Sequence, residues 1–109
     1  MRRLLVVTVV LLVCTAVASA AQRGRRTTHT VTIQGMQFTP ASLTIRRGDT
    51  VLWINKDIVA HTATSEAAGL FNSRVIPPDK SWKRTFPKRG DFPYFCTYHP
   101  TMNARVRVQ

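Results

Sequence analysis

Residues 90–108, GDFPYFCTYHPTMNARVRV, contain the pattern that decides the fold. In the first part of this stretch, Phe92, Tyr94 and Cys96 share one side of an alternating pattern, and residues 105–108 alternate arginine with valine. A period of two puts every second side chain on the same face of a β-strand. The stretch therefore predicts two strands joined by a loop.

Shorter alternating segments precede this stretch, and residues that favour turns separate them. Strands are expected at residues 30–33, 43–46, 50–55 and 81–86, with short ones at 69–71 and 74–76. Pro93 predicts a sheet edge or a bulge, because proline cannot donate a ladder hydrogen bond. No segment has the 3.6-residue period of a helix. Many short strands with frequent turns predict an all-β sandwich or barrel over residues 29–109.

The first 20 residues are expected to be a secretory signal peptide, with an apolar run at 4–13 and a small-residue cleavage site at 18–20. The run is too short to cross a bilayer, so no stable membrane insertion is expected. Lipid anchoring at Cys14 is disfavoured, because Val13 is bulky where such a site needs a small residue. Residues 21–28 are basic and lack periodicity, which predicts a flexible lead-in.

Cleavage after residue 20 leaves 89 residues, enough for one small core and a monomer. The formal charge of +11 becomes +9 when the two arginines of the signal peptide are removed. Export argues against nucleic acid as the partner. The positive charge then suits an acidic protein partner, an anionic membrane surface or simple solubility.

The exported chain keeps a single cysteine, Cys96, which cannot close an internal disulfide. Such a thiol is either buried and inert or bound to a metal. Its neighbours favour the metal, because His99 and Met102 follow at spacings of three residues. A thiolate, two imidazoles and a weak thioether describe a blue-copper electron-transfer site. The second imidazole is expected from His61, in an irregular segment after a central strand, and His29 is the only competitor.

Other uses of these residues fit less well. Structural zinc needs four closed ligands, with paired Cys or His at short separations. A papain-like nucleophile needs a distant His, an orienting Asn or Asp and a larger fold, and a c-type haem needs two cysteines before its His. No residue is placed to activate a substrate, so an enzyme is not expected.

Several further motifs bear a family resemblance that extends over residues 30–108. They are residues 36–40, 48–55, 71–73, 85–86 and 90–96, together with His61 and the Cys96-x2-His99-x2-Met102 loop. With these motifs the chain resembles the cupredoxin family, and within it the amicyanin and plastocyanin group. The two-residue gap between His99 and Met102 resembles the short, amicyanin-like form of the loop.

The resemblance implies a Greek-key β-sandwich of about eight strands, with one copper ion near one end. It implies that His61, Cys96 and His99 are close ligands and that Met102 is a long axial ligand. His99 would then present its ring edge through an apolar patch that Pro100 helps to shape. Redox protein partners, including acidic ones, would dock there.

The resemblance also identifies residues around the ligands. Met36 matches a position that flanks the site, and Asn55 ends a shared motif at the site rim. Tyr98 stands where amicyanin-like loops often have proline, and its amide is predicted to hydrogen-bond the Cys96 sulfur. Thr62 stands where related proteins commonly have Asn, and it is expected to replace only part of the tie between the ligand loops.

The sequence therefore predicts an exported carrier of single electrons, periplasmic or extracellular. The alternative is a copper-binding protein that delivers metal without an electron-transfer role, since it would use the same ligands. Delivery proteins tend to expose Met- and His-rich tracts, which this chain lacks. Copper oxidases of this fold class need further copper sites and domains, for which 89 residues leave no room.

Overall fold

The structure, a computed structural model, describes residues 25–109. The expected signal peptide lies outside the described residues. The described part contains eight strands and no helix, so no helix there is able to cross a membrane. The strands are β1 (Thr28–Gln34), β2 (Gln37–Thr39), β3 (Ser42–Ile45), β4 (Thr50–Asn55), β5 (Thr64–Ser65), β6 (Ser81–Thr85), β7 (Gly90–Cys96) and β8 (His99–Val108).

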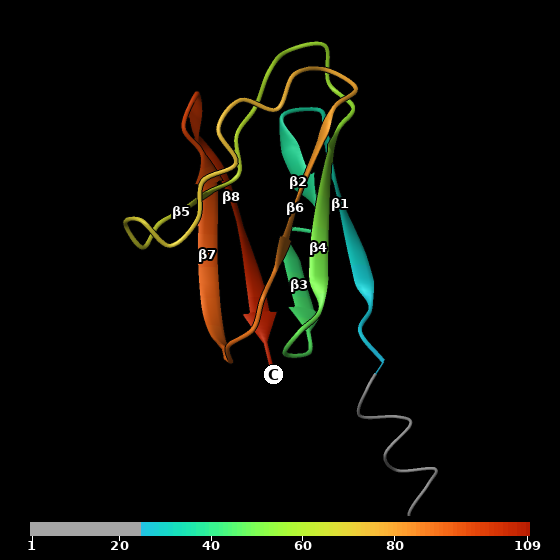
Figure 1. The fold of residues 1–109 in the computed structure, drawn as a ribbon. Coiled ribbons are helices and arrows are strands. Elements are labelled where there is room, and N and C mark those ends of the chain that lie inside the picture. The colour runs from blue at the N-terminus through green and yellow to red at the C-terminus, as the bar shows by residue number, and fades with distance from the viewer. Residues whose placement is uncertain (1–24) are drawn as a thin grey trace, which may run out of the picture.

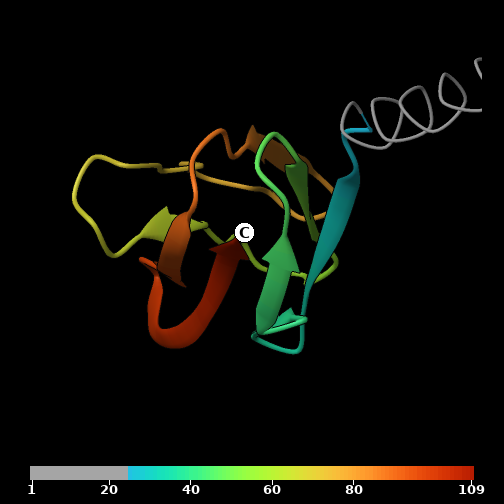
Figure 2. The same cartoon turned by 90° about the horizontal axis from the view of Figure 1, so that it is seen from below.

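The strands form two four-stranded sheets that face each other as a sandwich (Figures 1 and 2). One sheet has the order β2-β1-β4-β6, and the other has the order β3-β8-β7-β5. From β3 to β7, successive strands alternate between the two sheets. The β1–β4 and β3–β8 pairs are parallel and the remaining pairs are antiparallel. The predicted all-β sandwich of eight strands is confirmed.

The inward faces of the two sheets meet in one core. Alternation in β4 buries Val51, Trp53 and Asn55, as a strand with one face on the core requires. The Trp53 indole lies at the centre and contacts Tyr94 edge-on, with ring centroids 5.5 Å apart. Trp82, on the neighbouring strand β6, stacks on Trp53 at 5.3 Å. Aromatic rings thus contact one another in the middle of the core, and mainly aliphatic side chains fill the rest.

Three local expectations need correction or refinement. The short strands expected at 69–71 and 74–76 are absent from the described chain; instead β5 covers Thr64–Ser65, and isolated bridges join Thr64 to Asn72 and His61 to Ile76. Strand β2 lacked an alternating signal because it has only three residues. Strand β8 begins at His99, well before residue 105. Its buried positions, however, alternate regularly from Met102 onward.

Pro93 lies just beyond the part of β7 that pairs with β5, and its carbonyl accepts from the Glu66 amide at 3.0 Å. Strand β5 pairs with Phe95 and Tyr94, and β8 pairs with β7 along its whole length. In the described chain no strand pairs with Pro93 on the β5 side, although Glu66 bonds to it, and the register irregularity falls between Phe95 and Cys96.

Four connections gather at one end of the sandwich, at the top of Figure 1. They are the β1–β2 turn, the segment that follows β4, the segment that leads into β6 and the β7–β8 connection. All the candidate site residues except His29 lie on these connections or at the strand ends beside them.

Candidate metal centre

Cys96 and His61 come together although 35 residues separate them. Cys96 ends β7, and His61 lies in the irregular segment between β4 and β5. Both residues are 0% exposed. The Cys96 Sγ atom is 3.7 Å from His61 Nδ1. The backbone of His61 is fixed by two hydrogen bonds with Ile76, at 3.2 and 2.8 Å.

Asp57 determines which ring nitrogen of His61 faces the sulfur. Its Oδ2 lies 2.8 Å from His61 Nε2. An ionised carboxylate only accepts hydrogen bonds, so Nε2 carries the proton and donates it. In the neutral ring the unprotonated nitrogen is then Nδ1, the atom that faces Cys96. A carboxylate that orients an imidazole in this way is a common arrangement around protein-bound metals.

The same carboxylate holds the tight β1–β2 turn. The amide N–H groups of Gly35 and Met36 donate to Asp57 at 2.7 and 3.0 Å. Both residues have positive φ, 63° and 60°, as a two-residue hairpin turn requires. Burial alone raises the pKa of Asp57, but the hydrogen bonds from Met36, Gly35 and His61 outweigh it and hold that pKa below its ordinary value.

Asn55 shapes the segment between β4 and His61. It is fully buried, and its Nδ2 donates to the carbonyls of Val59 and Ile76 at 2.8 and 2.9 Å. Its Oδ1 accepts from the Asp57 amide at 2.9 Å. The side chain therefore satisfies backbone groups that an irregular buried segment leaves unpaired.

His99 and Met102 lie at the start of β8. His99 pairs with Cys96 across the β7–β8 connection, and its ring centroid is 5.3 Å from that of His61. His99 is partly exposed, whereas Met102 is 5% exposed and belongs to the same buried cluster as Cys96. One imidazole at the site is thus closed off from solvent and the other is open to it.

Thr62 joins the two segments that carry Cys96 and His61. Its amide donates to Cys96 Sγ at 3.4 Å. Its Oγ1 accepts from the Thr97 amide at 2.9 Å and lies 3.2 Å from the Thr97 hydroxyl. The threonine therefore makes a direct tie between the two segments, which is more than the sequence led us to expect.

The predicted hydrogen bond from the Tyr98 amide to the Cys96 sulfur is not present in the described chain, where the sulfur accepts from the Thr62 amide. The reason is local: residues 97 and 98 form a turn, and Tyr98 is half exposed. Pro100 and Met36 are also exposed, so all three lie at the rim of this end.

His29 lies at the other end of the sandwich. It pairs with Val51 at the start of β4, and its Nε2 is 2.9 Å from Asp49. Because the site lies beyond the opposite end of β4, His61 is the imidazole that meets Cys96. Sequence reasoning missed Asp57 as its partner; the signal available was an aspartate four residues before the histidine.

The donor set suits a metal with few strong ligands. A sulfur and a nitrogen that share one metal, at bond lengths of about 2.3 and 2.0 Å, lie roughly 3.5–3.7 Å apart when the bond angle is near tetrahedral or trigonal. The observed 3.7 Å fits that range. Within residues 25–109, no group of three His, Cys, Asp or Glu side chains forms a closed metal cluster. Two strong donors with a partly exposed imidazole and a thioether nearby suit copper better than structural zinc.

Comparisons with known proteins show which family the chain resembles. Residues 6–108 match the family model described as a cupredoxin-like domain. Amicyanin from Paracoccus versutus is 30% identical over 83 residues, which are 72% of this chain and 63% of that protein. Plastocyanin from Scenedesmus fuscus is 31% identical over 85 residues, 66% of this chain and 86% of that protein. The chain thus spans less than two thirds of the amicyanin.

Solved structures show the same likeness in three dimensions. A copper(I) form of an amicyanin variant superposes with a TM-score of 0.72 at 28% identity, covering 75% of this chain and 82% of that one. The similarity extends over most of the described residues, in which the two sheets and the candidate site lie.

Proposed function

Because the chain belongs to the cupredoxin-like family, we propose that it is a small type 1 copper protein that carries single electrons between redox partners. One copper ion is its cofactor, with His61 Nδ1, Cys96 Sγ and His99 as close ligands and Met102 as a weak axial ligand. The observation that carries the proposal is the buried pair of Cys96 Sγ and His61 Nδ1, 3.7 Å apart, with Nε2 already bonded to Asp57.

The protein's own residues prepare the site for a one-electron couple, which copper supplies when bound. Asp57 keeps the His61 ring in one orientation, and the Thr62 amide donates to the Cys96 sulfur. A hydrogen bond to the sulfur stabilises negative charge there and so favours the reduced state. Both ligand segments are tied to each other and to the sheets, so little movement accompanies a change of charge.

His99 is the proposed exit for the electron, because it is the partly exposed imidazole. Exposed apolar side chains lie on the connections at the same end: Met36, Ile58, Val59, Val75 and Tyr98. Isolated exposed apolar residues are ordinary, but five at one end of a small domain are typical of a contact surface. Lys56 and Arg74 are exposed beside them. The surface therefore complements a redox protein whose own contact surface is an apolar patch surrounded by carboxylates.

Export is part of the proposal. It rests on the amino-terminal sequence, with its basic start, apolar run and small-residue cleavage site. Maturation in the native host, followed by mass measurement of the secreted chain, tests it. A mass that still includes residues 1–20 would contradict export with cleavage.

Loading the purified mature protein with Cu(II) tests the carrier function. We expect an intense thiolate-to-copper band in the visible region, reversible bleaching on one-electron reduction, and loss of the band in Cys96→Ser. Arg107→Gln, which changes an exposed position of β8 away from the proposed ligands, is the folded control and keeps the colour. A nearly colourless product would remove the carrier function, and rapid copper loss to a mild chelator would favour delivery instead.

A further inference from the structure

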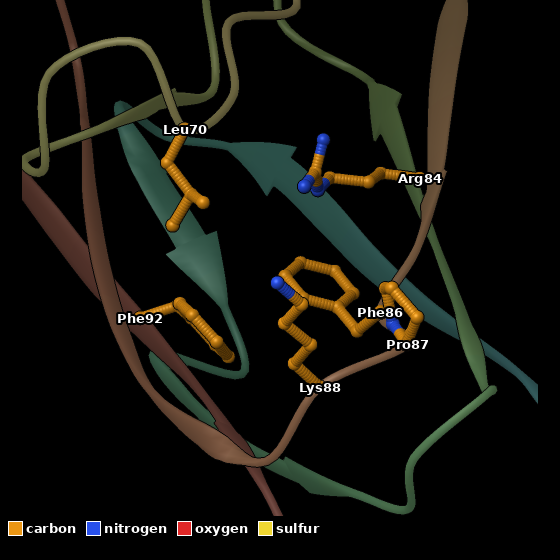
Figure 3. A pocket seen from close by; sticks show the side chains of 6 residues that line it. All are labelled: Leu70, Arg84, Phe86, Pro87, Lys88 and Phe92. Atoms are coloured by element: carbon orange, nitrogen blue, oxygen red, sulfur yellow. The ribbon is translucent and has the colours of Figure 1, made fainter.

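A second feature of the fold lies away from the metal centre. A cavity of about 140 Å³ opens between the two sheets, beside the edge strand β6. Its lining comes from β6, from the β6–β7 turn, from β7 and from the segment after β5, as Figure 3 shows. The lining residues are Leu70, Arg84, Phe86, Pro87, Lys88 and Phe92.

The cavity lies toward the end of the sandwich opposite the candidate copper site. Arg84 pairs with Val51 and Phe92 pairs with Val106, close to the far ends of their strands. Cys96 and His99 are at the other end of β7 and β8. The cavity is therefore not part of the metal centre.

The walls combine apolar rings with two cations. Phe86 and Phe92 are 5.6 Å apart between ring centroids, and Leu70 stands partly exposed at the mouth. The Arg84 guanidinium turns inward and lies over the Phe71 and Phe86 rings, 5.3 and 5.5 Å from their centroids.

Arg84 has no negative partner in the described part of the chain. Its Nε is buried without a hydrogen-bond acceptor, and neither Arg84 nor Lys88 is within 4.0 Å of a carboxylate oxygen there. A buried guanidinium N–H without an acceptor is costly, and stacking on aromatic rings offsets only part of that cost. An anion placed in the cavity would supply the missing acceptor.

We propose that this cavity binds a small carboxylic acid that carries one ring-sized apolar group. The apolar group lies between Phe86, Phe92 and Leu70, and the carboxylate meets Arg84 and Lys88. The size fits: an apolar cavity of roughly 150 Å³ accommodates benzene. The guanidinium fork matches the geometry of a carboxylate, which favours this anion over a point-like one.

A titration monitored by ¹H–¹⁵N correlation spectra tests the proposal. The ligand is 3-phenylpropionate, and the uncharged probe is 3-phenylpropanol, which has the same ring and chain length. We expect saturable shift changes at Leu70, Phe86 and Phe92, and an affinity for the alcohol at least about tenfold weaker.

Variants distinguish the contribution of Arg84 to binding from the contribution of the apolar walls. Arg84→Met keeps an unbranched stem, and we expect it to weaken binding of the acid about tenfold while binding of the alcohol stays unchanged. Lys83→Met is the matched control, because neighbouring residues of a strand point to opposite faces and Lys83 is exposed. Leu70→Trp fills the mouth and is expected to abolish binding of both probes.

One other explanation of the inward arginine competes with a ligand site. An inward charge on an edge strand also discourages pairing with other chains, and that role needs no ligand. Equal affinity for acid and alcohol, an unchanged affinity in Arg84→Met, or shifts confined to the surroundings of Cys96 would each overturn the proposal. If Arg84→Met does not fold, Leu70→Trp provides the test. Unaltered binding of the acid in Leu70→Trp would mean that the acid binds outside this cavity.

Discussion

Two histidine–aspartate pairs lie at opposite ends of this sandwich with nearly the same geometry. The distance from Nε2 to Oδ2 is 2.8 Å between His61 and Asp57, and 2.9 Å between His29 and Asp49. Each carboxylate also accepts two backbone amides. The donors are Gly35 and Met36 to Asp57, and Thr27 and Arg46 to Asp49. Each pair thus joins two segments of the chain: the β1–β2 turn and the segment after β4 at one end, and the start of β1 and the β3–β4 turn at the other.

The difference lies at the other ring nitrogen. His61 is fully buried and its Nδ1 faces the Cys96 sulfur, whereas the His29 side chain is 25% exposed and, within residues 25–109, makes no hydrogen bond to a sulfur. A carboxylate that orients a histidine is therefore not by itself a metal site. The same hydrogen-bonded unit stabilises a strand end in one place and aims a donor atom in the other.

Replacing the two histidines separately should produce the largest contrast. We expect His61→Gln to lose the visible thiolate-to-copper band, because one of the three proposed close ligands is gone. We expect His29→Gln to keep the band. Absorption spectra after loading with Cu(II) provide the measurement. A band retained in His61→Gln and lost in His29→Gln would reverse the assignment of the two ends.

Replacing the two aspartates should also affect copper binding at one end only, but the effect should be smaller than that of replacing the histidines. In Asp57→Asn the proposed ligand His61 remains while its orienting carboxylate is lost, and such changes lower metal affinity by about 10–100-fold. Asp49→Asn is the matched control and is expected to leave copper affinity unchanged. Competition with a chelator of known affinity measures both. Equal losses in the two variants would indicate a general loss of folding rather than a role at the metal.

Much of the fold was accessible from sequence because period two is visible wherever a strand is longer than about four residues. The predictions at β1, β3, β4, β6 and β7 are confirmed. Strands β2 and β5 have three and two residues, so their pairing depends on the neighbouring strands and not on any pattern of their own.

The candidate metal centre could be proposed from sequence in part, because Cys96, His99 and Met102 are close in the chain. His61 was inferred from its context, and the structure brings it to the sulfur through the path of the segment around it. The Asp57 contact depends on that path, so composition alone did not reveal it. The Tyr98 amide was assigned to the sulfur from its position in the sequence, although its direction is decided by a turn.

The stabilising contribution of Asp49, at the end of the sandwich opposite Cys96, should depend on pH. Burial raises the pKa of Asp49, but hydrogen bonds from Thr27, His29 and Arg46 outweigh it and hold the pKa below the ordinary 3.8. The carboxylate therefore stabilises the fold fully above pH 3.8, and this contribution is lost as the pH falls from there through the lower folded-state pKa.

We expect Asp49→Asn to cost about 1–2 kcal/mol of unfolding free energy at neutral pH. The gap to the wild type should narrow below pH 3.8, where the wild type loses the same contribution. Urea unfolding of the metal-free protein over a pH series measures this. Asp79→Asn, at an exposed turn residue with φ of 63°, is the control, since asparagine also tolerates that conformation. A gap that widens in acid would contradict the assignment.

A smaller effect is expected from Thr62→Val. The change keeps the shape of the side chain but removes the acceptor of the Thr97 amide, which should cost about 1 kcal/mol of stability. Copper release should also become faster, because the two ligand segments are no longer tied. Thr44→Val, at an exposed position of β3, is the control. Unchanged stability and unchanged release together would show that the tie has no role.

The smallest effect is expected from Tyr98→Pro. Proline removes the amide N–H, but the Cys96 sulfur already accepts from Thr62, and Tyr98 contributes no hydrogen bond to it. The reduction potential should therefore stay that of the wild type, as measured by voltammetry. A clear drop in the variant would mean that copper draws residues 97–99 inward until the Tyr98 amide reaches the sulfur. The two ends would then also differ in rigidity. The loop at His99 would change conformation when copper binds, whereas the His29–Asp49 end is held in place by the sheets.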